Sequence, residues 1–169
     1  MFKEIRKPVQ QSLAEQFRSV MSGLGDLKAA HVSGVDGIDP ASLGYDSSGL
    51  AYSIYLEKYM VYARLEHIQK GWGNTHVLSV EHPILHFSTP IDGLIVNAVA
   101  EVVEPSSHPF SVGYAPYGDI TIGASMALDP EIPIQSFETI TSTYLLLLSR
   151  AIEPSHSAVK SWVQRTQNR

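Results

Sequence analysis

The chain has 169 residues, of which 44% are hydrophobic and 17% charged, a balance typical of one folded domain with its own core. Its formal net charge of -5 offers no basic excess to neutralise phosphates, which argues against nucleic acid as the main partner. The chain has no cysteine, which excludes disulfides, thiolate catalysis and cysteine-based metal sites.

Neither the start of the chain nor its most apolar run resembles an export or membrane segment. Residues 1–7 place charges on both sides of their few apolar side chains, so they lack the apolar centre of a signal peptide. The leucine-rich run 144–148 is far shorter than the roughly 20 residues of a membrane-spanning helix. We therefore expect a cytoplasmic protein with no membrane partner.

The first elements are predicted from the spacing of apolar residues and from the glycines that follow them. Apolar side chains recur at helical spacing over about 8–22, at Val9, Leu13, Phe17 and Val20. Residues 27–32 have a strand-like composition, and three glycines and Pro40 break the pattern that follows. The sequence therefore predicts a helix, then a strand and a loop.

The stretch 49–69 allows two interpretations. Its first half alternates as a strand does, through Leu50, Tyr52, Ile54 and Leu56. Over its whole length a helical spacing recurs, through Ala51, Ile54, Lys58, Val61, Leu65 and Ile68. No turn residue interrupts the run, and Gly71 follows as a C-terminal stop. We therefore predict one long helix of roughly 30 Å, at 1.5 Å per residue.

After Gly71 the apolar period changes to two, which is typical of strands. The pattern predicts a strand over 77–87 bent at Pro83, a valine-rich strand over 94–104 and another over 119–128. For 139–150 we favour a strand, with a helix as the alternative. A short amphipathic helix is predicted over about 155–167.

The predicted order is helix, strand, long helix and then consecutive strands, which must pair antiparallel through short turns. Such a sheet buries one face and needs a cover, and the long helix is the obvious one. The sequence therefore predicts a single α+β domain over 1–169, with its core over about 26–150.

This order resembles the hotdog fold, and the start of the predicted long helix resembles the 4-hydroxybenzoyl-CoA thioesterase branch of that superfamily. The branch shows an Asp, two residues, a Gly and an apolar-apolar-Tyr/Trp run, with an Ala-Arg pair about four turns later. Asp46, Gly49, the run 50–52 and the pair 63–64 fit this pattern without a gap. Downstream, residues 83–93 resemble the strand of that branch and the turn that ends it.

The resemblance implies an antiparallel sheet wrapped around a long central helix, with extra N- and C-terminal helices. It also implies a homodimer or homotetramer that hydrolyses a small acyl thioester of CoA or acyl carrier protein. CoA or phosphopantetheine would then be part of the substrate, and no separate cofactor is expected. A non-hydrolytic acyltransferase or decarboxylase of a polyketide pathway is the nearest alternative.

The resemblance also assigns roles at the predicted helix start. It makes Asp46 the nucleophile or general base, and backbone N–H groups around Ser53 the oxyanion donors. The structural alternative is that Asp46 only caps the helix. Tyr52 is the third candidate catalytic residue, and the candidate substrate-binding residues are Gly49, Tyr55, Lys58 and His86.

Each of these side chains also has a structural explanation. The tyrosines form a stripe that suits packing against a sheet or a second subunit, and Lys58 suits an ion pair or a position at the edge of the core. His76, His82 and His86 lie in one predicted strand region, but Pro83 breaks its alternation and no carboxylate spacing accompanies them. We therefore expect no metal site.

A different class of function follows if 49–69 forms two strands. The order then becomes helix, three strands and later helices, which resembles secretion-chaperone-like domains that bind proteins without catalysis. A strand hairpin over 50–69 would overturn the hotdog interpretation.

The catalytic hypothesis predicts that Asp46→Asn abolishes turnover of an acyl thioester while leaving folding nearly intact, because the amide can neither attack nor accept a proton. Release of free thiol from the substrate measures turnover. Unchanged turnover in the variant would remove Asp46 from the mechanism.

Overall fold

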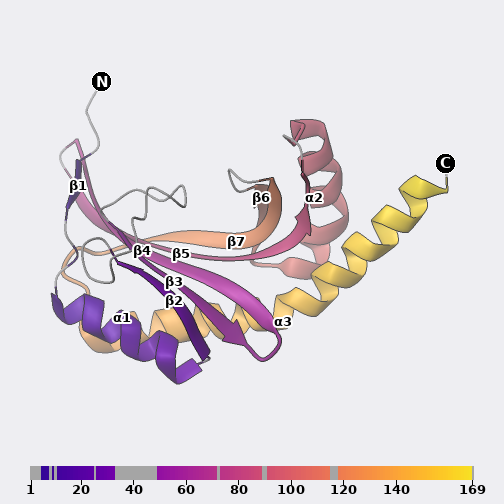
Figure 1. The fold of residues 1–169 in the computed structure, drawn as a ribbon. Coiled ribbons are helices and arrows are strands. Elements are labelled where there is room, and N and C mark those ends of the chain that lie inside the picture. The colour runs from indigo at the N-terminus through magenta and orange to yellow at the C-terminus, as the bar shows by residue number, and fades with distance from the viewer. Residues whose placement is uncertain are drawn as a thin grey trace. The chain divides into compact units, whose positions relative to one another are not determined.

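The computed structural model describes residues 5–7, 9, 11–24, 26–32, 49–71, 73–88, 91–114 and 118–168. These residues form an α+β arrangement, as the sequence predicts (Figure 1). Its elements in chain order are β1 (Ile5–Lys7), α1 (Gln11–Leu24), β2 (Asp26–Val32), β3 (Gly49–Leu56), β4 (Tyr59–Lys70), β5 (Gly73–His86), α2 (Gly93–Ser107), β6 (Ser111–Tyr114), β7 (Asp119–Leu128) and α3 (Ile134–Gln167).

The strands of the described residues pair in the order β2-β3-β4-β5-β7-β6, and β1 also pairs with β4. The pairs β1–β4, β2–β3, β3–β4 and β6–β7 are antiparallel. In the β3–β4 pair, Leu50 lies opposite Leu65 and Ile54 lies opposite Val61. This register places the apolar side chains of both strands on one face.

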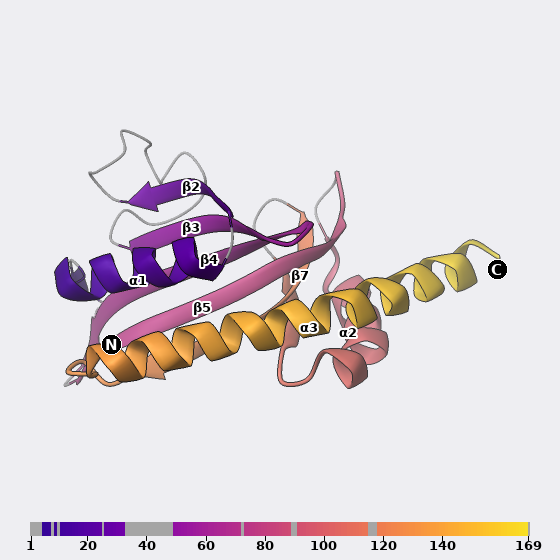
Figure 2. The ribbon, with the colours of Figure 1, turned by 90° about the horizontal axis from the view of Figure 1, so that it is seen from below.

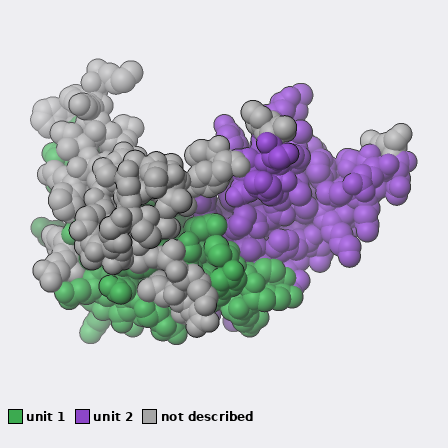
Figure 3. All heavy atoms as spheres, viewed as in Figure 1, with its two compact units in different colours: residues 1–80, 125–144 green, residues 81–124, 145–169 purple. Residues whose placement is uncertain are grey.

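The chain divides into two compact units (Figure 3). Unit 1 comprises residues 1–80 and 125–144, and unit 2 comprises residues 81–124 and 145–169. β5, β7 and α3 contribute residues to both units.

The prediction of one long helix over 49–69 is wrong, because these residues form the antiparallel hairpin β3–β4. The connecting residues are Glu57 and Lys58, and Glu57 adopts a positive φ of 57°. Two-residue hairpin turns need such a φ, usually from Gly, Asn or Asp, so the turn has no local signal in the sequence. The aromatic and β-branched residues on either side favour strands, and their alternation was the better guide.

The predicted strand over 94–104 is also wrong, because these residues belong to α2. Asp92 caps this helix, since its carboxylate accepts a hydrogen bond from Leu94 N at 2.9 Å. Val99, Val103 and Ser107 are its buried residues, at a spacing of four. The valines are thus arranged for a helix, and their β-propensity alone was misleading.

The prediction of a strand over 139–150 is wrong and its helical alternative is confirmed, because α3 runs from Ile134 to Gln167. It includes the predicted C-terminal helix and passes through Pro154, whose missing N–H leaves one carbonyl without its usual donor. The predicted N-terminal helix and the strands over 27–32, 77–87 and 119–128 are confirmed by α1, β2, β5 and β7.

The core of unit 1 is centred on Phe17, which is fully buried on α1. Its ring lies 5.1 Å from that of Tyr52 on β3 and 6.1 Å from that of Phe137 on α3, measured between centroids. α1 and the first part of α3 therefore cover the same face of the strands, as seen from below in Figure 2. One aromatic side chain joins three elements that are far apart in the sequence.

Unit 2 has its own apolar core. The buried side chains of α3 in this unit recur at helical spacing, at Leu145, Leu148, Ile152, Ser155 and Val159. β7 contributes Ile120 and Ile122, and α2 contributes Val99 and Val103. The hydroxyl of buried Ser107 donates to Phe110 O at 3.0 Å, which holds the end of α2 against the start of β6.

Phe17→Ala is expected to lower the free energy of unfolding by about 3–5 kcal/mol, because it leaves a cavity where three elements meet. The matched control is Leu94→Ala on α2, where the leucine is 75% exposed and the expected change is within about 0.5 kcal/mol. Urea unfolding followed by far-UV circular dichroism measures both. An equal, small effect of the two substitutions would contradict the central role of Phe17.

Candidate functional site

The strands of unit 1 have two different faces, because successive side chains of a strand point to opposite sides. One face is the apolar core that includes Tyr52. The other, here called the polar face, carries Ser53, Tyr62, Arg64 and Glu66 from β3 and β4 and Ser79 and Ser125 from β5 and β7. It is the candidate functional site of this unit, and on it Ser53 and Glu66 are buried whereas Tyr62 and Arg64 are partly exposed.

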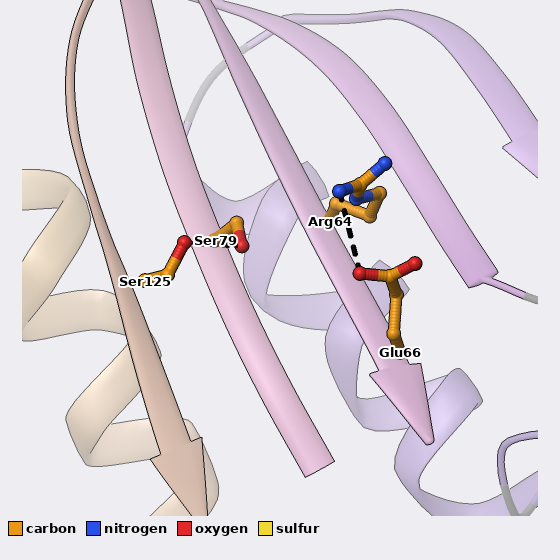
Figure 4. A network of polar contacts seen from close by, with 4 residues as sticks. All are labelled: Arg64, Glu66, Ser79 and Ser125. Carbon is orange, nitrogen blue, oxygen red and sulfur yellow. Dashed lines mark hydrogen bonds and ion pairs between the residues drawn. The ribbon is translucent and has the colours of Figure 1, made fainter. Parts of the chain in front are cut away.

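An ion pair lies on the polar face. Arg64 Nη2 is 3.3 Å from Glu66 Oε2, and the two residues are two positions apart on β4 (Figure 4). The Glu66 side chain is only 5% exposed, whereas that of Arg64 is 32% exposed. The ion pair therefore offsets part of the cost of burying this carboxylate.

Two serines extend the polar face across β5 and β7. Ser79 Oγ and Ser125 Oγ are 2.8 Å apart, in a hydrogen bond in which either hydroxyl can donate. In Figure 4 the labelled side chains rise from the side of the strands that faces away from the helices behind them. Thr75 Oγ1 donates to Leu128 O at 2.9 Å and ties the same two strands together.

The structure separates two of the predicted catalytic residues. Tyr52 is buried in the core beside Phe17, while Ser53 is 5% exposed on the polar face opposite Tyr62. Asp46, the third of them, lies outside the described residues. The described catalytic candidates are therefore neighbours in sequence but lie on opposite sides of a sheet.

The backbone around Ser53 is engaged in the sheet. β3 lies between β2 and β4, and Ser53 pairs with Ala29 on one side and Tyr62 on the other. The expected oxyanion donors depended on a helix start, where the first N–H groups have no intrahelical partner. A central strand uses its N–H groups in the ladders instead, so β3 does not supply such donors.

The predicted substrate-binding residues do not converge either. Gly49 begins β3 opposite Glu66, and Tyr55 lies near the other end of β3, opposite Met60. Lys58 lies in the exposed hairpin turn, with its ammonium 5.0 Å from the ring centroid of Tyr59, a cation–π distance. His86 lies in unit 2, away from these residues in the sequence, and contacts Asp119.

In unit 2, His86 forms a pair with Asp119. The ring Nδ1 of His86 is 2.5 Å from Asp119 Oδ1, and the histidine side chain is 70% exposed. A carboxylate on Nδ1 fixes the tautomer and leaves Nε2 available as a base or a ligand. Within the described part of the chain, no serine or threonine hydroxyl is hydrogen-bonded to this ring, so the pair lacks the nucleophile of a Ser-His-Asp triad.

A second histidine pair joins β5 to α3 within unit 2. His82 Nε2 and His156 Nε2 are 2.8 Å apart, which requires one ring to donate and the other to accept. The two histidines are 74 positions apart, so inspection of the sequence does not reveal this pair. The described residues include no group of three or more His, Cys, Asp or Glu side chains placed to hold a metal ion.

A third histidine contact lies between β4 and β5 in unit 1. The rings of His67 and His76 stack with centroids 4.5 Å apart, and His76 is fully buried. Burial lowers the pKa of His76, because the charged ring loses its hydration, and the neighbouring His67 lowers it further. The backbone of Asp129 acts in the opposite direction and raises the pKa, although neither ring nitrogen of His76 has a hydrogen-bond partner among the described residues.

The lowered pKa of His76 predicts how stability depends on pH. The unfolded chain, with an ordinary histidine pKa of 6.5, binds the proton more readily than the folded protein. The free energy of unfolding is therefore expected to fall as the pH drops below about 6.5, by at most about 1.4 kcal/mol per pH unit from this group.

Urea unfolding between pH 7.5 and pH 5 measures this slope. His76→Leu is expected to make it shallower, whereas substitution of the exposed His108 by Gln is expected to preserve it. An unchanged slope in His76→Leu would contradict the assignment to His76.

Comparison with protein-family models, curated proteins and solved structures gives no match for this chain. Among the described residues, no helix combines the length and apolar character needed to cross a membrane.

Proposed function

We propose that this chain is a protein-binding domain with the arrangement of a secretion-chaperone-like domain. The observation that supports it is the hairpin β3–β4, in place of the long helix. With that hairpin, the described elements run as β1, α1, the four strands β2 to β5, α2, the strands β6 and β7, and α3. The non-catalytic alternative predicts a helix, three strands and later helices, so the observed order adds β1, a fourth consecutive strand and the pair β6–β7.

The side chains of the sheet fit a binding role better than a catalytic one. The predicted acid and oxyanion arrangement needs a free helix start, whereas Ser53 and its neighbours lie within a paired strand. Sheets recognise proteins through their edges and faces, with side chains supplying specificity. Apolar side chains left in solvent add to such surfaces, and Leu94, Tyr114 and Leu146 in unit 2 are 52–75% exposed.

An array of peptides of varied composition tests this proposal, with hits confirmed by fluorescence anisotropy on the purified chain. Saturable binding of a subset of peptides, competed by the same unlabelled peptides, is the expected result. Absence of saturable binding across the array would contradict a protein-binding function.

The second candidate is an acyl-thioester enzyme, acting by hydrolysis, transfer or decarboxylation, and assembled as a homodimer or homotetramer. The hairpin β3–β4 removes the helix predicted over 49–69, so in a hotdog-type arrangement α3 would have to be the central helix. This candidate is supported by the order of residue types from Asp46 to Arg64 and by an α+β sheet accompanied by one long helix, α3. A panel of acyl-CoA and acyl-carrier thioesters, assayed for free thiol and by mass spectrometry, distinguishes its three reactions. Turnover that is lost in Asp46→Asn would favour this candidate over the binding domain.

A further inference from the structure

β6 is the last strand on the described path of the sheet. The backbone N–H and C=O groups that it directs away from β7 can be identified residue by residue. Val112 N donates to Glu104 Oε1 at 3.1 Å, so this N–H points away from β7. The N–H and C=O of one strand residue point the same way and alternate along the strand. Val112 and Tyr114 therefore present their backbone groups at the outer edge, and Ser111 and Gly113 pair with β7.

α2 packs against β6, but residues on both faces of the strand are exposed. The Tyr114 side chain is 65% exposed, and Ser111 is also exposed. A Cβ built on Gly113 would meet no atom within 4 Å. The contact that occupies the edge is the carboxylate of Glu104, an exposed side chain of α2. A charged group on an edge amide is a common protection against non-specific strand pairing.

The charge around this edge indicates what kind of strand would fit it. Residues 81–124, which supply α2, β6 and the first half of β7, contain no lysine or arginine. Their five acidic residues are Glu81, Asp92, Glu101, Glu104 and Asp119. The basic residues of unit 2 all lie in its other segment, 145–169, at Arg150, Lys160, Arg165 and Arg169. A basic segment is therefore the complementary partner, and an acidic one would be repelled.

We propose that the outer edge of β6 binds an extended basic peptide segment of a partner protein, which adds a strand to the sheet. This inference rests on the proposed protein-binding function and names its surface and its ligand. A carbonyl of the incoming strand replaces Glu104 at Val112 N, and the released carboxylate pairs with a lysine or arginine of the peptide. Glu104 thus shields the empty edge and selects the charge of its occupant.

The first test uses peptides and leaves the protein unchanged. Three fluorescein-labelled peptides of about ten residues are compared by anisotropy: one alternating Val/Thr with Lys, one with Glu in place of Lys, and one basic peptide N-methylated at alternate amides. The basic peptide is expected to bind at least about tenfold more tightly than the other two, since each lost hydrogen bond or ion pair is worth about a factor of ten. Its affinity is expected to fall with added salt.

The second test changes the edge of the protein. Val112→Pro removes the outward N–H and leaves the ladder with β7 intact, so about tenfold weaker binding of the basic peptide is expected. Glu104→Gln keeps an acceptor without the charge and should reduce both the affinity and its salt dependence. Glu101→Gln, on the same helix but without the bond to β6, is the matched control and should have the smaller effect.

Several outcomes would overturn the inference while the protein-binding function stands. One is that the N-methylated peptide binds as tightly as the unmethylated basic peptide. Another is that a folded Val112→Pro variant binds the basic peptide with unchanged affinity. The third is that affinity in the peptide array does not depend on peptide charge. A dimer in light scattering that Val112→Pro converts to a monomer would show that a second copy occupies the edge instead. Failure of every peptide, in the array and here, would overturn the proposed function itself.

Discussion

The two-residue turn at Glu57 and Lys58 is the constraint on which the rest of the structure depends. It reverses the chain between β3 and β4 and fixes their register from Gly49–Glu66 to Leu56–Tyr59. Glu57 adopts a φ of 57°, at a cost of the order of 1–3 kcal/mol for a residue other than glycine. The paired strands offset that cost by burying Ile54, Val61 and Leu65 completely.

Once the hairpin is formed, the positions of the candidate residues follow. Because successive side chains of β3 point to opposite faces, Tyr52 lies in the core against Phe17. Ser53 lies on the polar face with Arg64 and Glu66. The backbone of β3 is used on both sides by its neighbouring strands, so no free amides remain there for an oxyanion. At β6, the backbone groups of Val112 and Tyr114 face away from β7. These features are the support for the proposed binding of a polypeptide.

The sequence predicted correctly those elements whose apolar spacing fits either a helix or a strand alone. The predictions were wrong where the spacing of a helix and that of a strand occur in the same segment. α1, β2, β5 and β7 follow from apolar spacing with glycines or prolines at their ends. In 49–69 the alternation and the helical spacing coexist, and the turn at Glu57 carries no glycine or asparagine to decide between them. In α2, the β-propensity of valine concealed a helical stripe that the cap at Asp92 would have revealed. The pairs His82–His156 and His86–Asp119 join residues 74 and 33 positions apart, which no local pattern encodes.

The most direct test of this account is disulfide trapping in 49–70, which is unambiguous because the chain has no cysteine of its own. In the hairpin, Ser53 and Tyr62 are direct partners, within reach of a disulfide. Ser53 lies within β3 and Glu57 in the turn that follows it, roughly 13 Å away at the rise of a strand. In a helix, 53 and 57 would be neighbours, and 53 and 62 would be separated by about 13 Å. The account predicts rapid oxidation of the Ser53→Cys/Tyr62→Cys protein and none of the Ser53→Cys/Glu57→Cys protein. The opposite result would restore the long helix and contradict the hairpin.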